Sequence, residues 1–221
     1  MNAFLHVLAG NWRFVLVAIG TTVALSAASI SLGFLLGIVI AIGRTYGGAV
    51  LAALLGFYVD TMRSVPLLAI LVWTYFALPL LTGTAITPFV AAVIVLSCHL
   101  AAYVAEAVRA GLTSVRPGQM RAALALGMSL PQTVRRVILP QAAIRMLPAF
   151  GSLAVVAVKD SATASVIAVP ELIRQTQVLV SNTYLSFQLY SFTMLVFFLL
   201  AFPLAYGVER LYQRMAHLGS S

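Results

Sequence analysis

The sequence predicts an all-α membrane protein with about five transmembrane helices, and three observations support that prediction. Hydrophobic residues make up 62% of the chain and charged residues only 8%, whereas a soluble domain needs roughly a quarter charged residues to cover its surface. The mean hydropathy is +1.05. Long charge-free runs alternate with short polar segments, so lipid has to be the solvent for most of the chain. We expect one transmembrane domain, 1–221, without a separate soluble domain.

Five apolar segments are long enough to be membrane spans. The first is free of charge between Arg13 and Arg44. At about 1.5 Å per residue it exceeds a hydrocarbon core of roughly 30 Å, so it crosses once, with tilt. The second segment is interrupted by Asp60, Arg63 and Pro66. The predicted spans are 14–43, 49–80, 86–106, 137–158 and 185–207.

The basic residues predict how the chain is oriented. Thirteen Lys and Arg against five Asp and Glu give a net charge of +8. Most of the bases lie beside apolar spans, which indicates membrane topology and not nucleic-acid binding. With segment 109–136 in the cytosol, nine arginines lie on inner segments and three basic residues on outer ones. The positive-inside rule then predicts an outer N-terminus, a cytosolic C-terminus and a tight outer loop at 77–88.

The N-terminus has neither the basic region nor the cleavage site of a removable signal peptide. The single cysteine, Cys98, excludes an intrachain disulfide and a multi-cysteine metal cluster.

The polar segment 109–136 breaks the apolar pattern with a short helix. Residues 119–126 are rich in the helix formers Ala and Leu. Gly127 is suited to a left-handed helix end, and Ser129 with Gln132 has the spacing of a capping box for the next helix. Three side chains at four-residue spacing form an apolar stripe: Met120, Leu124 and Met128. The residues alone leave open whether this stripe docks on a partner, folds back on the spans or lies on the membrane surface.

This stretch resembles the EAA motif of ATP-binding-cassette (ABC) importer permeases, in which E-A-A, three residues, G, nine residues and I-x-L-P follow one another. Here the motif reads Arg121-Ala122-Ala123, then Gly127, then Val137-Ile138-Leu139-Pro140. Arg121 replaces the usual Glu and reverses its charge, and Val137 conservatively replaces Ile. The resemblance implies that the 119–128 helix is the coupling helix, seated in a groove of a separate ATPase subunit. The implied coupling residues are Gly118, Gln119, Arg121, Ala122, Ala123, Leu124, Gly127, Met128 and Pro140.

Four further segments resemble the polar amino acid branch of that family: "YVDTMRSVPLL", "AAYVAEAVRAGLTSVRPGQ", "LPQAAIRMLP" and "VKDSATASVIAVPELIRQTQ". The resemblance implies a type I ABC importer permease fold in a bacterial inner membrane. It implies three kinds of protein partner: an ATPase dimer that binds ATP and Mg²⁺, a second permease that is the same or a sister chain, and an external solute-binding protein. The implied substrate is a polar amino acid such as glutamine, glutamate, aspartate or a basic amino acid.

Charged residues in the second span are candidates for the transport pathway. Asp60 and Arg63 lie three residues apart and share a helix face. An unpaired charge in the bilayer is costly, so the two either neutralise each other or lie at the inner interface. The resemblance instead suggests that Arg63 lines the path and meets a substrate carboxylate. Pro66 should free backbone carbonyls, which suits either interpretation.

The end of the fourth span carries a second group of candidates for the path or its gate. Lys159 and Asp160 are an adjacent cation and anion. They suit the two charged ends of an amino acid, and they equally suit a mutual structural pair. Ser161 and Thr163 offer hydroxyls that can satisfy backbone groups at a broken helix.

The remaining polar residues have simpler interpretations. Glu106 and Arg109 are also three apart, and we expect an ion pair at the inner end of the third span that positions the coupling loop. His99 has no metal partners at ligand spacing, so we expect packing or one hydrogen bond and no metal site. Glu171 follows a proline and predicts a short outer helix, which either touches the binding protein or caps the pore.

The sequence gives little support for catalysis, because it has no Walker lysine motif, no HExxH and no defensible serine–histidine arrangement. We therefore expect a permease that is not itself an enzyme, with ATP hydrolysis by another chain. A stand-alone secondary transporter or channel is the alternative, and it would not need an apolar cytosolic helix. A membrane-embedded lipid enzyme would need acidic or histidine clusters near an interface, which this chain lacks.

Overall fold

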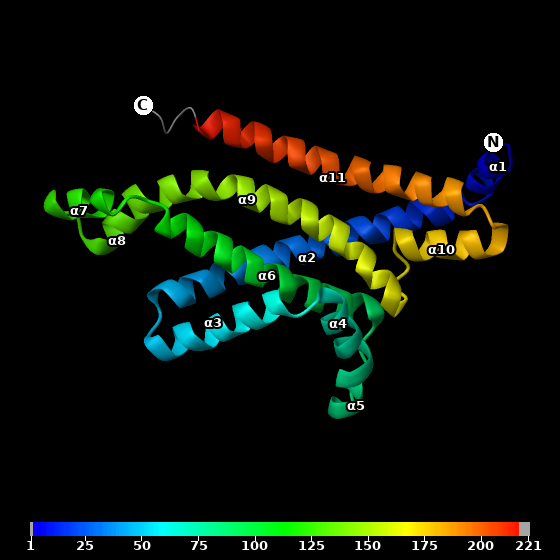
Figure 1. Ribbon diagram of the computed structural model, residues 1–221, viewed down its shortest axis with the longest axis horizontal. Coiled ribbons are helices and arrows are strands. Elements are labelled where there is room, and N and C mark those ends of the chain that lie inside the picture. Colours follow the sequence, from blue (N-terminus) through cyan, green and yellow to red (C-terminus); the bar gives the residue numbers. More distant parts are fainter. Residues whose placement is uncertain (1, 217–221) are drawn as a thin grey trace.

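The computed structural model describes residues 2–216, which form a helical bundle with no strand in that range (Figure 1). The α-helices are α1 (Asn2–Gly10), α2 (Trp12–Tyr46), α3 (Ala49–Ser64), α4 (Leu67–Val72), α5 (Leu78–Thr82), α6 (Pro88–Thr113), α7 (Pro117–Ala125), α8 (Leu130–Thr133), α9 (Leu139–Asp160), α10 (Leu172–Thr183) and α11 (Ser186–Ala216). Two π-helical turns, η1 (Trp73–Ala77) and η2 (Val134–Ile138), and one 3₁₀ segment, η3 (Ser161–Ile167), connect some of them. The predicted all-α fold is confirmed.

Among the described residues, four helical segments are long and apolar enough to cross a membrane: Trp12–Tyr46, Pro88–Thr113, Leu130–Ile167 and Ser186–Met215. They correspond to the first, third, fourth and fifth predicted spans. The third and fifth begin one or two residues later than predicted, and all four continue beyond the predicted C-terminal bounds. The extra turns carry charged residues such as Arg44 and Arg109 at the helix ends. In the sequence, a charged residue marks the end of an apolar run. The helical backbone nevertheless continues past that residue, so the helices are longer than the apolar runs.

The second predicted span, 49–80, is not one straight helix. α3 and the segment Leu67–Thr82 meet at an angle of 104°, and α4 and α5 turn away from the line of α3 (Figure 1). The break lies at Val65 and Pro66, whose ψ angles of 134° and 130° are extended. Proline has no N–H and disfavours helical backbone in the preceding residue, so α3 has to end there.

The predicted outer loop at 77–88 is partly helical, because α5 continues to Thr82. Gly83 ends α5 in a left-handed conformation with φ of 68°. The loop proper therefore occupies only 83–87.

Glycines allow α2 and α6 to approach closely. A Cβ atom added at Gly37 would lie 2.6 Å from the Cβ of Val104, and one at Gly33 would lie 2.8 Å from a methyl carbon of Leu100. Small residues are typical of helix contacts in membranes, where packing holds helices together because lipid is as apolar as the side chains. Val59 of α3 joins the same buried core. The α2–α6 contact is therefore the centre of the bundle.

α10 is fixed to the bundle at the end where the N-terminus lies (Figure 1). Thr22 Oγ1 accepts a hydrogen bond of 3.0 Å from the backbone N–H of Leu172. Glu171 caps the helix by accepting from the N–H groups of Ile173 and Arg174 at 2.9 and 2.7 Å. Glu171 is completely buried, and that burial raises its pKa to about 7. The predicted short helix exists, but Glu171 serves as its buried cap and not as a surface contact.

We predict that Gly37→Val destabilises the protein and that Gly20→Val, on the same helix, does not. The added methyl groups at position 37 collide with α6, which should lower the free energy of unfolding by about 1–3 kcal/mol. A Cβ at Gly20 meets nothing within 4 Å. Unfolding in mixed detergent micelles measures both variants. Equal destabilisation of the two would contradict the close α2–α6 contact.

Candidate coupling surface and transport pathway

α7 and α8 form the tip of the bundle, at the end opposite α1 and α10 (Figure 1). α7 starts at Pro117 and ends at Ala125, so it lies slightly earlier than the predicted 119–126. Gly127 adopts φ of 80°, the left-handed end that the sequence predicts. The N–H of Gly127 donates to the carbonyl of Leu124 at 3.0 Å, and the N–H of Met128 donates to that of Ala123 at 3.2 Å. This pair of bonds is the Schellman motif, which fixes the exit from α7.

The predicted capping box is present immediately after this turn. The N–H of Ser129 donates to Gln132 Oε1 at 2.9 Å, and the N–H of Gln132 donates to Ser129 Oγ at 3.4 Å. α8 then continues through the π-helical turn η2 into α9 without a break in helicity. The chain therefore runs from α7 into α9 through one short corner that the Schellman motif and the capping box fix.

The side chains of α7 divide between the bundle and the outside. Ala123 is buried and Met120 packs against the core cluster. Leu124 is 43% exposed and Leu126, which the sequence pattern misses because it lies beyond the stripe, is 84% exposed. The other exposed residues from the start of α7 to the turn are Pro117, Gly118, Gln119, Arg121, Ala122, Ala125 and Gly127. The tip thus presents a small apolar surface with one arginine.

Two groups of polar contacts tie the base of this tip to the bundle. Arg145 of α9 donates through Nη1 to the carbonyl of Ser114, at the end of α6, and lies 3.3 Å from its hydroxyl. Glu106 forms the predicted ion pair with Arg109, through Nε at 3.1 and 3.2 Å and through Nη2. Arg44 of α2 also contacts Glu106 at 3.1 Å. One carboxylate therefore joins two arginines from two helices.

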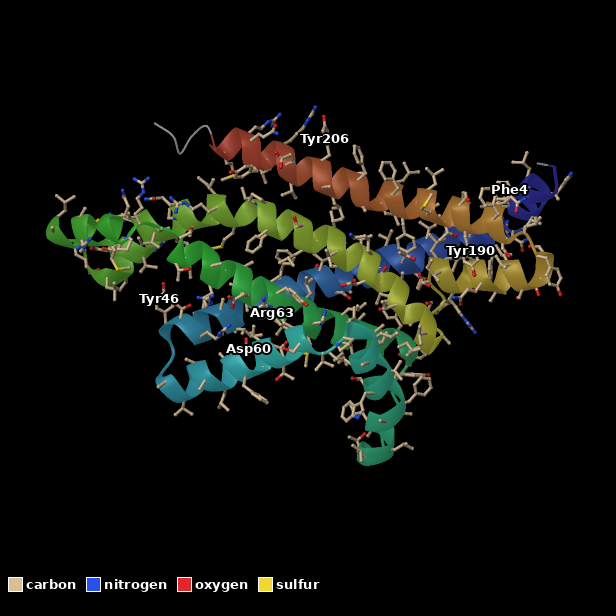
Figure 2. All side chains as sticks on the ribbon, in the orientation of Figure 1. Phe4, Tyr46, Asp60, Arg63, Tyr190 and Tyr206 are labelled. Carbon is tan, nitrogen blue, oxygen red and sulfur yellow. The ribbon has the colours of Figure 1, made fainter. Side chains whose placement is uncertain are left out.

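Asp60 and Arg63 do not neutralise each other, because no ion pair joins them within residues 2–216. The guanidinium of Arg63 lies 5.6 Å from the ring centroid of Tyr103 on α6, a cation–π contact. Figure 2 places Arg63 between α3 and α6. Asp60 is exposed. Arg63 is exposed as well, and the contact that the structure shows for its guanidinium is with an aromatic ring and not with a carboxylate.

A cavity of about 330 Å³ lies between the broken second span, α6 and α9. Asp160 lines it from the end of α9, and Leu67 lines it from the residue after Pro66. His99 packs its ring edge-to-face against Tyr103 at 5.1 Å, and its Nδ1 is buried without a hydrogen-bond partner. The lining residues are Leu67, His99, Leu100, Tyr103, Leu153, Val156 and Asp160.

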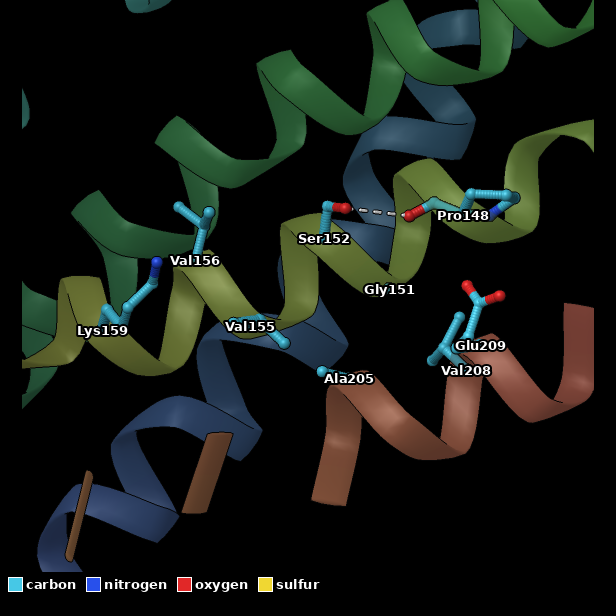
Figure 3. Close-up of a pocket in the computed structure, with 9 residues that line it drawn as sticks. All are labelled: Pro148, Gly151, Ser152, Val155, Val156, Lys159, Ala205, Val208 and Glu209. Atoms are coloured by element: carbon cyan, nitrogen blue, oxygen red, sulfur yellow. Dashed lines mark hydrogen bonds between the residues drawn. The ribbon is translucent and has the colours of Figure 1, made fainter. Parts of the chain in front are cut away.

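Lys159 and Asp160 line two different cavities, although they are adjacent in the chain. Lys159 lines a groove of about 500 Å³ between α9 and α11, together with Ser152 and Glu209 (Figure 3). The two cavities share only Val156. Successive residues on a helix point about 100° apart, so an adjacent pair cannot face one site from a regular helix end.

The hydroxyls of Ser161 and Thr163 are used by the backbone where α9 tightens into η3. Ser161 Oγ donates to the carbonyl of Val158 at 2.7 Å, and Thr163 Oγ1 donates to that of Asp160 at 2.7 Å. These bonds satisfy carbonyls that the helix end frees, as expected. No group of three metal-ligating side chains occurs in the part of the chain that the structure describes.

The comparisons with known proteins identify the class to which this fold and tip belong. Residues 33–217 match the family described as the binding-protein-dependent transport system inner membrane component, and the chain belongs to that family. It is a multi-pass ABC importer permease for amino acids, located in the bacterial inner membrane and not itself an enzyme.

Individual relatives agree with that class. The chain is 32% identical over 195 residues to the glutamine transport system permease protein GlnP of Escherichia coli K12, covering 88% of this chain and 89% of that protein. It is 34% identical over 194 residues to the probable glutamine ABC transporter permease protein GlnM of Bacillus subtilis, with the same two coverages. A crystal structure of an amino acid ABC transporter with histidines superposes with a TM-score of 0.89 at 31% identity, covering 96% and 98% of the two chains.

We predict that Glu106→Gln lowers the free energy of unfolding by about 1–2 kcal/mol, because two partly exposed arginines lose their shared counter-charge. Glu209→Gln is the matched control, since Glu209 is exposed and, among residues 2–216, bonds only to Gln213, at 2.8 Å. Unfolding in mixed micelles compares them. A loss for Glu209→Gln as large as that for Glu106→Gln would mean that the Glu106 contacts contribute nothing specific.

Proposed function

We propose that this chain moves a polar amino acid inward, driven by a separate ATPase dimer that docks on α7 and supplied by an external solute-binding protein. Glutamine is the first candidate because two relatives are named for glutamine transport; glutamate, aspartate and basic amino acids are the others. The observation that carries the proposal is the tip: a short helix with outward apolar side chains, held at one end of the bundle by the turn at Gly127. In this proposal ATP and Mg²⁺ bind to the ATPase, and the permease itself needs no cofactor.

The corner between α7 and α9 supports a mechanical role for α7. A displacement of α7 is transmitted to α9 through the Schellman turn and the capping box, because both restrict the backbone conformation between Ala125 and Gln132. α9 carries Asp160 at its far end, where it lines the cavity. Movement of the ATPase subunits is thereby transmitted along one helix to the pathway. Arg145 keeps the end of α6 attached to α9 through the carbonyl of Ser114.

The cavity at Asp160 supports a pathway with its own recognition groups. Its volume of about 330 Å³ falls at the small end of ligand sites, which hold roughly 300–1,000 Å³. Asp160 offers a carboxylate for a substrate ammonium group. Arg63, held on Tyr103, offers a guanidinium near the same cavity for a substrate carboxylate. Pro66 contributes by breaking the second span beside Leu67.

The groove between α9 and α11 supports pairing with a second permease, which is either a second copy or a sister chain. Lys159, Ser152 and Glu209 line that groove (Figure 3), and charged side chains within a span are costly when they face lipid. Only 6% of the apolar window of α11 is buried within the chain. A partner permease on this side would cover those groups and enclose the path.

The orientation with the N-terminus outside and the C-terminus in the cytosol follows from the same proposal. α7 has to face the cytosolic ATPase, and the C-terminal end of α11 runs toward the same end of the bundle as α7 (Figure 1). Arginines gather at this end, as the positive-inside rule requires: Arg44, Arg109, Arg116, Arg121, Arg135, Arg136, Arg145, Arg210 and Arg214.

We predict that Gly127→Val abolishes ATP-driven uptake while the protein still inserts in the membrane. Valine is strained at φ of 80°, so the Schellman turn opens and α7 loses its fixed position. Gly127→Asn is the control, since Asn tolerates the left-handed conformation and should keep most of the uptake. Uptake and ATPase activity of the complex in proteoliposomes measure both variants. Full uptake by Gly127→Val would contradict the coupling role of the turn.

We predict that Asp160→Asn raises the substrate concentration for half-maximal uptake or changes selectivity, because the cavity loses its carboxylate. Asp60→Asn, at an exposed position on α3, should leave both unchanged. Uptake of a panel of labelled amino acids by the reconstituted complex provides the measurement. Identical affinity and selectivity in Asp160→Asn and the parent would assign Asp160 a structural role only.

A further inference from the structure

A row of aromatic rings on α11 ends on an arginine. The rings of Phe198 and Phe202 stack with centroids 5.2 Å apart, and those of Phe202 and Tyr206 stack at 5.9 Å. The guanidinium of Arg210 lies 4.4 Å from the centroid of Tyr206. All four side chains are exposed within the chain. Arg210 forms no ion pair with an acidic side chain in residues 2–216. The contact that the structure shows for its guanidinium is the cation–π contact with Tyr206.

This row faces away from the bundle. Val208 packs against α9, where a Cβ atom added at Gly151 would lie 2.5 Å from it. Tyr206 and Val208 are two residues apart, so their side chains point about 200° apart around α11. Figure 2 shows Tyr206 on the outer side of the helix. In a membrane-spanning chain, that side meets the surroundings of the bundle.

An apolar cleft of about 400 Å³ opens beside the row, between α2 and α11. Leu199 and Pro203 line it from α11 and are both exposed. At about 100° per residue, these two residues share one face of α11 with Tyr206 and Arg210, within roughly 60°. At 1.5 Å per residue, the cleft begins roughly 10 Å from Arg210 along the helix and reaches to about 17 Å. From α2 the cleft is lined by Val23, Ser26, Ala27 and Ile30.

We propose that this face binds an anionic phospholipid, with the phosphate on Arg210 and one acyl chain in the cleft between α2 and α11. The planar guanidinium presents paired N–H donors that match phosphate oxygens, and its stacking on Tyr206 orders it beforehand. The walls of the cleft are almost wholly hydrocarbon, which suits an acyl chain. The distance along α11 between the charge and the cleft matches a lipid whose head lies at the interface and whose tail reaches inward.

The chemistry of the face favours lipid over a second permease as its occupant. The charged groups Lys159 and Glu209 line a separate groove, the one between α9 and α11. The face with Tyr206 and Arg210 instead has an apolar body and a single cationic end. That arrangement is the one by which interfacial aromatic and basic residues anchor in a bilayer.

Two independent variants test the proposal in the full permease complex, reconstituted in nanodiscs that contain phosphatidylglycerol and phosphatidylcholine. Arg210→Gln removes the headgroup donor, and Ala27→Phe places a ring in the cleft. Native mass spectrometry counts the phosphatidylglycerol that stays bound after extraction. Each variant should lower its retention about tenfold, since a charge-assisted hydrogen bond or the chain site is lost. Melting in pure phosphatidylcholine should match the parent.

Matched controls separate this site from general effects. Arg13→Gln removes another arginine that lies over an aromatic ring, 5.2 Å from Trp12, and Ala24→Phe adds a ring on α2 at an exposed position that does not line the cleft. Both should retain phosphatidylglycerol like the parent.

The proposal is overturned if Arg210→Gln and Ala27→Phe retain the lipid fully, or if the two controls lose as much. Dissociation of the permease pair in these variants, with unchanged lipid retention, would overturn it in favour of a protein interface. Displacement of the lipid by millimolar inorganic phosphate alone would show that the cleft adds nothing and would also contradict the proposal.

Discussion

The absence of hydrogen-bonding solvent in the bilayer is the constraint on which this structure depends. Every backbone group within a span has to be satisfied by the protein itself, which is why the described chain is almost wholly helical. The same constraint explains the places where helices break. The hydroxyls of Ser161 and Thr163 bond the carbonyls freed where α9 tightens, and the break at Pro66 is followed by Leu67, which lines a cavity. Glu106 likewise lies between two arginines.

The tip of the bundle obeys a different requirement, because it extends beyond the long spans. Its exposed apolar side chains are few, and its position comes from backbone geometry: a left-handed glycine, a Schellman turn and a capping box that lie close together in the chain. Such a corner is stiff without being bulky. A partner that binds the tip and displaces it can therefore move α9 as well, because the corner between them is stiff. α9 ends at the cavity that Asp160 lines.

Local features of this fold could be predicted from the sequence, and features that depend on distant residues could not. The conformation of Gly127 and the bonds of Ser129 with Gln132 follow from residues within six positions, and both predictions are confirmed. Arg44 was missed as a partner of Glu106 because 62 residues separate them. Pro66 predicts a break in the second span, but it does not predict the angle of 104° between the two helical segments.

The candidate site shows the same division. Lys159 and Asp160 looked like one site because they are neighbours in sequence, yet the helix directs them into different cavities. Arg63 is a candidate because its segment resembles that of the family, and only the fold reveals Tyr103 as the ring that it contacts. The roles of these residues in transport stay predictions.

The most direct test of the central claim, that α7 docks on an ATPase, is site-specific photo-crosslinking in membranes that contain the permease and its co-expressed ATPase. A photoreactive residue at Leu126, which is 84% exposed at the tip, should form a crosslink to the ATPase subunit. The same residue at Leu54, which is 63% exposed on α3, should not. Crosslinks from position 126 to lipid alone, in a preparation where the ATPase still co-purifies, would contradict the account.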